Sequence, residues 1–159
     1  MYDKLLNAFA ESFKCKVAYR EDLALPGFNI YCGPMDFETI NYNVHVDLQF
    51  IDLNWAPQGS ADFDRTMSFT LPIATPSSGS GLNIWNLTQK DIDESELDDS
   101  ERLAPDLAVR QVYRPGIATI HDGKHYHQMT VSSPWHSYDE RITLQGHGLM
   151  QGTTLIVYG

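Results

Sequence analysis

The order of hydrophobic and polar positions divides the chain into two unequal parts. Near the N-terminus, Leu5, Phe9 and Phe13 recur at helical spacing, which predicts one amphipathic helix over residues 2–14. From Leu25 onward the pattern changes to short runs of β-branched and aromatic residues, separated by Pro and Gly. The sequence therefore predicts a mostly β protein with a short N-terminal helix.

Nine runs have the composition of strands. They span residues 28–32, 42–51, 66–74, 82–87, 108–113, 117–121, 126–131, 141–144 and 153–158. Residues 75–81 form a Pro/Ser/Gly turn that we interpret as a strand connection. No internal repeat and no change of composition marks a boundary, so residues 1–159 are predicted to form a single domain.

An acidic run lies between two of the predicted strands, from Asp91 to Glu101. Carboxylates at this density predict a solvent-exposed loop or helix outside the β core, because each charge would cost several kcal/mol if it were buried without a partner. The functional alternative is a lid or a docking surface for a basic partner.

Charge and cysteine content narrow the class of protein. Asp and Glu outnumber Lys and Arg by 21 to 11, giving a formal net charge of -10. This charge opposes general attraction to nucleic acid or anionic lipid, so we expect neither as a partner. Two cysteines, Cys15 and Cys32, are too few for a disulfide framework. Because no apolar run reaches the roughly 20 residues of a membrane span and the N-terminus lacks a signal-peptide core, we expect a soluble cytoplasmic protein.

Candidate metal chemistry begins at His45 and Asp47, which lie two residues apart in a β-like run. Alternate side chains of a strand share a face, so both can point into one cavity while the intervening valines face the other way. Imidazole nitrogen and carboxylate oxygen suit Fe(II), and two histidines with one carboxylate leave three positions open. The pattern therefore needs a second histidine further along the chain.

Five downstream histidines compete for this role. They are His121, His125, His127, His136 and His147. Asp122 and Gly123 predict a tight hairpin turn, which puts His121 at the end of the incoming strand. His125 and His127 share the parity of the outgoing strand; His127 is favoured and His125 is the alternative. We expect His136 and His147 to be surface or structurally satisfied groups.

An anion-binding pair follows the candidate histidine. Arg141 and Thr143 point the same way on a predicted strand, in an otherwise uncharged stretch. A guanidinium fork beside a hydroxyl is suited to bidentate binding of a small carboxylate.

With these residues in view, the chain resembles the Fe(II)/2-oxoglutarate-dependent oxygenase superfamily from about residue 42 to residue 145. Members carry His-x-Asp and a distal His, followed by Arg-x-Ser/Thr, on a double-stranded β-helix, a cupin-like jelly roll. His45, Asp47 and His127 match the metal ligands, and Arg141 and Thr143 match the pair that binds the 2-oxoglutarate C5 carboxylate. Segments 66–73 and 78–85 are similar to the family's strand, glycine turn and strand.

The resemblance implies an Fe(II)- and 2-oxoglutarate-dependent dioxygenase of the prolyl-hydroxylase-like kind, which hydroxylates a small molecule or peptide and releases succinate and CO2. Related halogenases have a small residue where this chain has Asp47, so the carboxylate favours hydroxylation or a desaturation-like outcome. Tyr42 resembles a tyrosine near the site in some relatives, although strand parity directs it to the opposite face. The chain is short for the family, and we expect a second subunit of a homodimer as one source of substrate-binding elements.

Two alternatives use the same architecture. His125 and His127 resemble the His-x-His of a cupin-like metal protein, but the glutamate expected soon after them is missing. In the other, a metal-free jelly-roll module binds a sugar or protein through exposed tryptophans, for which Trp55, Trp85 and Trp135 are the candidates.

Overall fold

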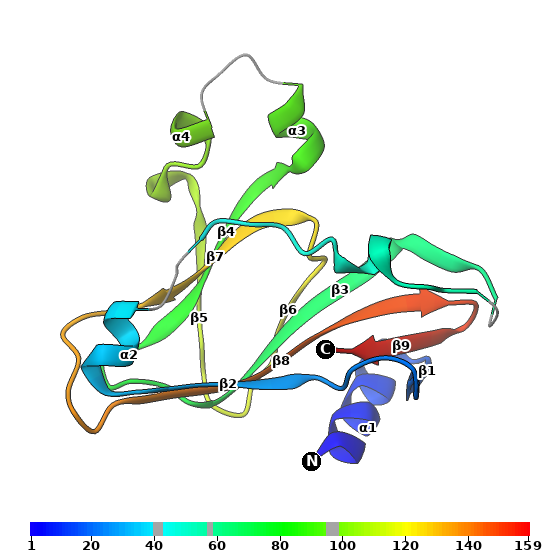
Figure 1. Ribbon diagram of the computed structural model, residues 1–159, viewed down its shortest axis with the longest axis horizontal. Coiled ribbons are helices and arrows are strands. Elements are labelled where there is room, and N and C mark those ends of the chain that lie inside the picture. The colour runs from blue at the N-terminus through cyan, green and yellow to red at the C-terminus, as the bar shows by residue number, and fades with distance from the viewer. Residues whose placement is uncertain (40–42, 57–58, 95–98) are drawn as a thin grey trace.

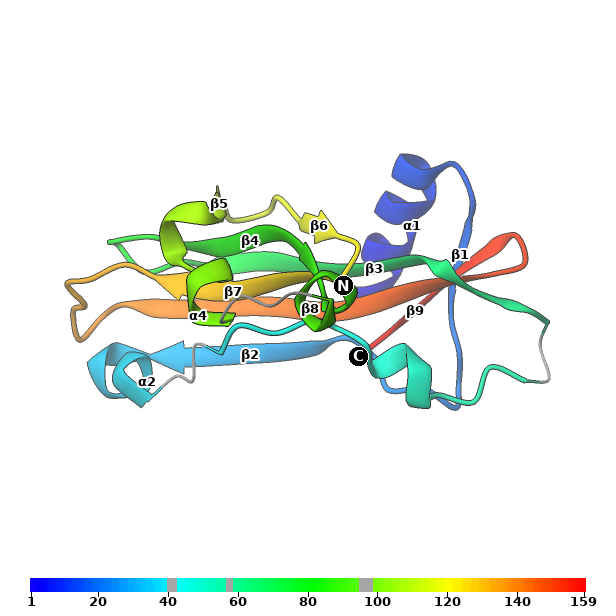
Figure 2. The same cartoon turned by 90° about the horizontal axis from the view of Figure 1, so that it is seen from above.

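The computed structural model describes residues 1–39, 43–56, 59–94 and 99–159, in which two β-sheets form a sandwich (Figures 1 and 2). The strands are β1 (Lys16–Tyr19), β2 (Gly27–Cys32), β3 (Ala61–Ala74), β4 (Ser80–Thr88), β5 (Val109–Val112), β6 (Thr119–His121), β7 (His125–Val131), β8 (Glu140–Gln151) and β9 (Thr154–Tyr158). The larger sheet has the order β1-β9-β8-β3-β6, with β2 also paired to β8, and the smaller sheet has the order β5-β4-β7. The mostly β, jelly-roll prediction is confirmed.

The helices are few and short. They are α1 (Tyr2–Phe13), α2 (Gly33–Thr39), α3 (Gln89–Asp93) and α4 (Asp99–Arg102), together with the 3-10 turns η1 (Gln49–Asp52) and η2 (Pro105–Leu107). None of the helices in the described ranges has the length and apolar content to cross a membrane.

The predicted N-terminal helix is α1, and it packs on the outer face of the larger sheet. Leu5 and Phe9 are buried in one cluster with Phe69 and Leu144, and the rings of Phe9 and Phe69 meet edge to face with centroids 5.1 Å apart. Burial of a side chain such as Phe9 contributes about 2 to 3 kcal/mol. The amphipathic pattern of α1 is thus explained by core packing.

Alternation along β3 separates this outer core from a polar inner face. Met67 and Phe69 belong to the apolar cluster under α1, whereas Ser68 and Thr70 point to the opposite face and line a cavity between the sheets. β8, the antiparallel neighbour of β3, alternates in the same way, with Leu144 in the outer core. The central strands of the larger sheet therefore supply a polar floor to the sandwich.

The strand predicted over residues 42–51 is wrong. His45 forms only an isolated bridge to His127, and residues 49–52 turn into η1. The backbone hydrogen bonds explain why. His45 and His127 exchange two backbone hydrogen bonds of 2.9 and 3.0 Å, but the N–H of Asp47, which would continue this ladder, donates to the Gly123 carbonyl at 2.7 Å. Pairing therefore stops after one bridge. Tyr42 lies outside the described residues.

The hairpin predicted at Asp122 and Gly123 is also wrong, although the turn is present. β6 pairs with β3 in the larger sheet, whereas β7 pairs with β4 in the smaller one, so the turn carries the chain from one sheet to the other. Gly123 has φ +76°, and the Asp122 carboxylate accepts the N–H groups of Lys124 and His125 at 3.0 and 3.2 Å. This crossing brings His121 of β6 and His127 of β7, which belong to different sheets, to the same cavity.

Two further elements were not predicted. β1 pairs in parallel with β9 over Lys16–Tyr19, and α2 begins at Gly33-Pro34, one of the Pro and Gly breaks that separate the predicted strands. Proline is well tolerated in the first turn of a helix, where its missing N–H costs no hydrogen bond.

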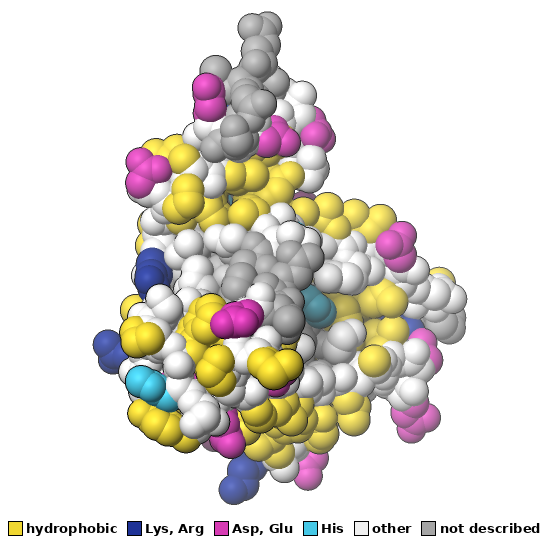
Figure 3. Space-filling view, turned by 60° about the vertical axis from the view of Figure 1, so that its left-hand side comes forward, with side chains coloured by type: hydrophobic (Ala, Val, Ile, Leu, Met, Phe, Trp, Pro, Cys, Tyr) yellow, Lys and Arg dark blue, Asp and Glu magenta, His cyan; other side chains and the backbone are white. Residues whose placement is uncertain are grey.

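The acidic residues in the described part of this run are exposed, as predicted, whereas Ile92 is buried. α3 and α4 project together from the ends of β4 and β5, away from α1 (Figure 1), and acidic side chains gather on this projection (Figure 3). Asp91 closes a capping box with Thr88 at the start of α3. Residues 95–98 lie outside the described residues.

Two of the three tryptophans proposed as exposed binding residues of a metal-free module are buried. Trp55 and Trp85 are only 6% and 1% exposed, and their indole N–H groups donate to the carbonyls of Phe50 and Ala104 at 2.7 and 2.9 Å. A buried indole N–H usually finds a hydrogen-bond partner inside the protein. Trp55 and Trp85 are therefore core residues and are not available to bind a sugar or protein.

Candidate metal centre

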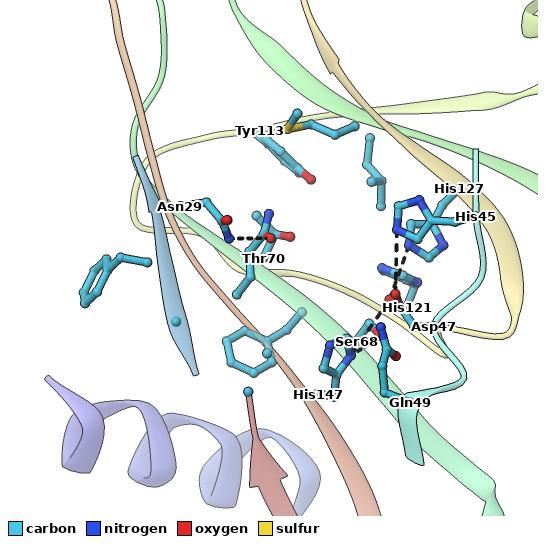
Figure 4. Close-up of a pocket in the computed structure, with 18 of the residues that line it drawn as sticks. Asn29, His45, Asp47, Gln49, Ser68, Thr70, Tyr113, His121, His127 and His147 are labelled. Carbon is cyan, nitrogen blue, oxygen red and sulfur yellow. Dashed lines mark hydrogen bonds and ion pairs between the residues drawn. The ribbon is translucent and has the colours of Figure 1, made fainter. Parts of the chain in front are cut away.

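Three predicted residues converge between the sheets. His45 Nε2 lies 3.7 Å from Asp47 Oδ1, and His127 Nε2 lies 3.3 Å from Asp47 Oδ2. All three ligand atoms lie within 4.8 Å of one another, and Figure 4 shows both imidazoles directed at the carboxylate. Ligands in neighbouring positions around an ion at about 2.1 Å are roughly 3 Å apart, so small side-chain movements would let these atoms share one metal ion.

Both histidines are oriented by the same kind of hydrogen bond, from Nδ1 to a backbone carbonyl. His45 Nδ1 bonds to the Asn43 carbonyl, and His127 Nδ1 bonds to the His125 carbonyl, each at 2.9 Å. A carbonyl only accepts, so each Nδ1 carries the proton and each Nε2 is left with a lone pair facing Asp47. This is the usual orientation of metal-binding histidines, and in both cases the carbonyl lies two residues before the imidazole.

The charges of the centre are coupled. Burial would raise the pKa of Asp47, but its contacts with His127, Ser68 and His147 outweigh burial and hold that pKa well below its usual value. Burial would lower the pKa of His127, but the Asp47 carboxylate outweighs it and raises that pKa. The carboxylate is therefore ionised across the physiological range, as a ligand to a divalent ion must be.

His125, the alternative ligand, takes another partner. Its Nδ1 lies 2.7 Å from Asp122 Oδ2 on the crossing turn, and it is not among the cavity-lining residues. His136 is exposed and stacks on Tyr138 with ring centroids 5.1 Å apart, in agreement with its predicted surface role. Of the pair on β7, the structure brings His127 to Asp47.

Arg141 extends the site along β8. It is fully buried at 0% exposure, it lines the cavity of about 460 Å³ that contains the three metal-site residues, and its guanidinium carbon lies 5.6 and 5.8 Å from the ring centroids of Tyr31 and Tyr113. Thr143 has the same strand parity as Arg141 and is also fully buried, but it is not among the cavity-lining residues. Its hydroxyl has no hydrogen-bond partner among the described residues. A guanidinium fork that lines a cavity is suited to bidentate binding of a carboxylate.

Further polar groups line the cavity that the sequence analysis did not assign. Tyr113 faces Thr70 and Arg141, although burial outweighs both and raises the pKa of its hydroxyl. Asn29 donates to the side-chain carbonyl of Gln145 at 2.7 Å across β2 and β8. The sequence contained a signal for two of these residues. Gln145 has the same strand parity as Arg141, and Thr70 alternates with the apolar residues beside it in β3.

Two more histidines surround Asp47. His121 packs against His127 with ring centroids 4.4 Å apart. His147 Nδ1 lies 3.0 Å from Ser68 Oγ and 3.9 Å from Asp47 Oδ2. His147, which we expected to be a surface or structurally satisfied group, has Ser68 as its partner and is directed into the cavity by its parity with Arg141 on β8 (Figure 4).

Comparison with known proteins supports the fold. No family model and no curated protein matches the sequence. A solved structure described as a novel N-substituted L-amino acid dioxygenase from Burkholderia ambifaria AMMD has a TM-score of 0.59 and 14% identity, and the match covers 98% of this chain and 63% of that one. A structure of a protein described in the same words, in complex with alpha-KG, has a TM-score of 0.52 and 16% identity, covering 85% and 52%. The chain thus spans about half to two thirds of the length of these neighbours, and at such identities the likeness establishes the jelly-roll fold.

Proposed function

We propose that the protein is an Fe(II)- and 2-oxoglutarate-dependent dioxygenase. The observation that carries the proposal is the convergence of His45, Asp47 and His127, with both Nε2 atoms directed at the Asp47 carboxylate, in a cavity that also holds the buried Arg141. Two imidazoles and one carboxylate form the donor set that suits Fe(II) and leaves positions open for a cosubstrate and dioxygen.

Each part of the cavity has a separate task. His45, Asp47 and His127 would hold the iron, which when bound supplies the redox chemistry that couples 2-oxoglutarate decarboxylation to oxidation of a C–H bond. Arg141 and Thr143 would hold the far carboxylate of 2-oxoglutarate, since the guanidinium offers a rigid fork and the buried Thr143 hydroxyl offers one more donor. The carboxylate of Asp47 occupies the position that is a small residue in related halogenases, which favours hydroxylation.

The substrate class follows from the cavity only in outline. Among the described lining residues, Arg141 is the one Lys or Arg, so a second anionic group would have to find its partner among the histidines and neutral side chains. The neighbours are described as N-substituted L-amino acid dioxygenases, and N-substituted amino acids are accordingly the first compounds to test, together with their uncharged amides and short peptides.

The experiment is an anaerobic titration of 2-oxoglutarate into the Fe(II)-loaded protein. Chelation of iron by the keto acid produces a metal-to-ligand charge-transfer band, and we expect wild type to show it. Asp47→Ala and His127→Ala should lose most of their iron, because each removes one of three protein ligands. His136→Ala is the matched control and should bind iron like wild type.

Arg141 separates cosubstrate binding from metal binding. Arg141→Ala should keep its iron but bind 2-oxoglutarate more weakly by about 2 to 5 kcal/mol, the cost of removing one partner of a desolvated charged pair. Arg141→Lys should lie between the two, because lysine keeps the charge and loses the fork. The exposed Arg65→Ala is the control. A wild-type protein that binds iron and never shows the band would favour the cupin-like alternative.

A further inference from the structure

We propose that Ser68 and His147 are positioning residues that fix the orientation of the Asp47 carboxylate at the metal centre. This inference rests on the proposed function only in that Asp47 is a metal ligand. Ser68 and His147 are polar side chains of the larger sheet that are not among the proposed metal ligands.

The sheet register brings the two residues together. Ser68 on β3 and His147 on β8 are direct partners in the antiparallel pairing, and both face the cavity. Directly opposed residues of an antiparallel pair have Cβ atoms about 5 Å apart, so the short serine and the imidazole can meet; Ser68 Oγ lies 3.0 Å from His147 Nδ1. Their contact is therefore built into two rigid central strands.

Asp47 lies at the end of this contact. His147 Nδ1 lies 3.9 Å from Asp47 Oδ2, and Ser68 Oγ, which contacts that same nitrogen, lines the same cavity as Asp47. Ser68 is 4% exposed. Figure 4 shows the serine and the imidazole on the side of the Asp47 carboxylate away from His45 and His127. A serine hydroxyl there can donate to the carboxylate while it accepts from His147 Nδ1–H.

The crossing turn closes the remaining side. Asp47 N–H donates to the Gly123 carbonyl at 2.7 Å, and a Cβ on Gly123 would lie 2.7 Å from Ser68 Oγ and 3.2 Å from Asp47 Cβ. Backbone and side chain of Asp47 are thus held from two independent elements. A carboxylate fixed in this way needs little reorganisation to accept a metal ion.

The test measures metal binding without turnover. Co(II) is titrated into the apo-protein, its affinity is determined by competition with a chelator, and its visible absorption reports the ligand geometry. Ser68→Ala and His147→Leu should each weaken Co(II) affinity by about tenfold, the usual effect of removing a group that supports a metal ligand, and should alter the visible spectrum. His147→Gln, which keeps a donor at a similar position, should recover part of the affinity.

Controls separate positioning from folding. Ser12→Ala and His136→Gln make the same chemical changes at exposed positions and should leave affinity and spectrum unchanged. Chemical denaturation of the apo-proteins should show folded variants, because the contact lies in the cavity and outside the two apolar clusters. If His147→Leu unfolds, Ser68→Ala and His147→Gln decide the question.

The outcomes are distinct. Wild-type affinity and spectrum in folded Ser68→Ala and His147→Gln, with Co(II) binding lost in Asp47→Ala, would overturn this inference and leave the proposed metal centre standing. A wild-type protein that binds no Co(II) would overturn the proposed function itself.

Discussion

The pKa values of the cavity histidines depend on the balance between burial and contact with the Asp47 carboxylate. Burial, with the nearby His127 as a second cause, lowers the pKa of His121 to about 4, and Gly123 N–H donates to its Nδ1 at 3.2 Å, which fixes the neutral form. Burial also lowers the pKa of His147, against the attraction of Asp47. His127 behaves oppositely, because its contact with Asp47 raises its pKa.

The pKa of His121 predicts a specific loss of stability in acid. An unfolded histidine titrates near pH 6.5, so between about pH 6.5 and pH 4 the unfolded chain binds a proton that folded His121 refuses. Its contribution is complete above pH 6.5 and falls as the pH falls, by about 2 kcal/mol at pH 5. Urea unfolding of the apo-protein should therefore give a smaller difference between pH 7.5 and pH 5 for His121→Gln than for wild type.

His136→Gln is the control for this experiment, since it makes the same substitution at an exposed position outside the cavity. The comparison is made as a difference between variants because His127 and Asp47 add pH dependences of their own, His127 with the opposite sign to His121. An identical pH dependence for His121→Gln and wild type would show that His121 is not held neutral.

The element that does most to assemble the site is the turn at Asp122 and Gly123, and it predicts unequal effects of two glycine substitutions. Gly123 and Gly116 have φ +76° and +82°, so alanine at either should cost about 1 to 2 kcal/mol for the left-handed conformation. A Cβ at Gly116 meets nothing within 4 Å, whereas one at Gly123 meets Ser68 and Asp47. Gly123→Ala should therefore be the more destabilising in denaturant unfolding, and it alone should weaken Co(II) binding. Equal effects of the two changes would contradict this role of the turn.

Sequence parity predicted the face of β8 that carries Arg141 and Thr143, because this strand is long and regularly paired. It could not predict the course of residues 43–48, since a His-x-Asp run with alternating valines has the same pattern whether it forms a long ladder or one bridge. The Asp-Gly step likewise predicts a tight turn but not whether the next strand returns to the same sheet. Both outcomes depend on tertiary hydrogen bonds, chiefly Asp47 to Gly123, which have no local signature.

For the whole molecule, chemistry and charge are kept apart. The cavity with Asp47 and Arg141 lies between the sheets, whereas many of the surplus carboxylates lie on the projection formed by α3 and α4 (Figure 3). With a formal net charge of -10, the chain repels other polyanions. Exposed carboxylates next to the candidate metal centre would compete with Asp47 for the metal ion. Asp47 and His127 are therefore buried between the sheets, apart from this acidic projection, whereas the His45 side chain is half exposed.

This organisation predicts additive thermal stabilisation by metal and cosubstrate. Ligands that bind only the folded state stabilise it by about 2.7 kcal/mol at 100 times their Kd, and for a chain of 159 residues this raises Tm by about 5 to 11 °C. In scanning calorimetry, Co(II) should raise the Tm of wild type and 2-oxoglutarate should raise it again. Asp47→Ala should lose both increments. Arg141→Ala should keep the increment from Co(II) and lose most of the one from 2-oxoglutarate, while Arg65→Ala should keep both. A full 2-oxoglutarate increment in Arg141→Ala would place the cosubstrate carboxylate elsewhere in the cavity, because the stabilisation measures binding at whichever residues hold it.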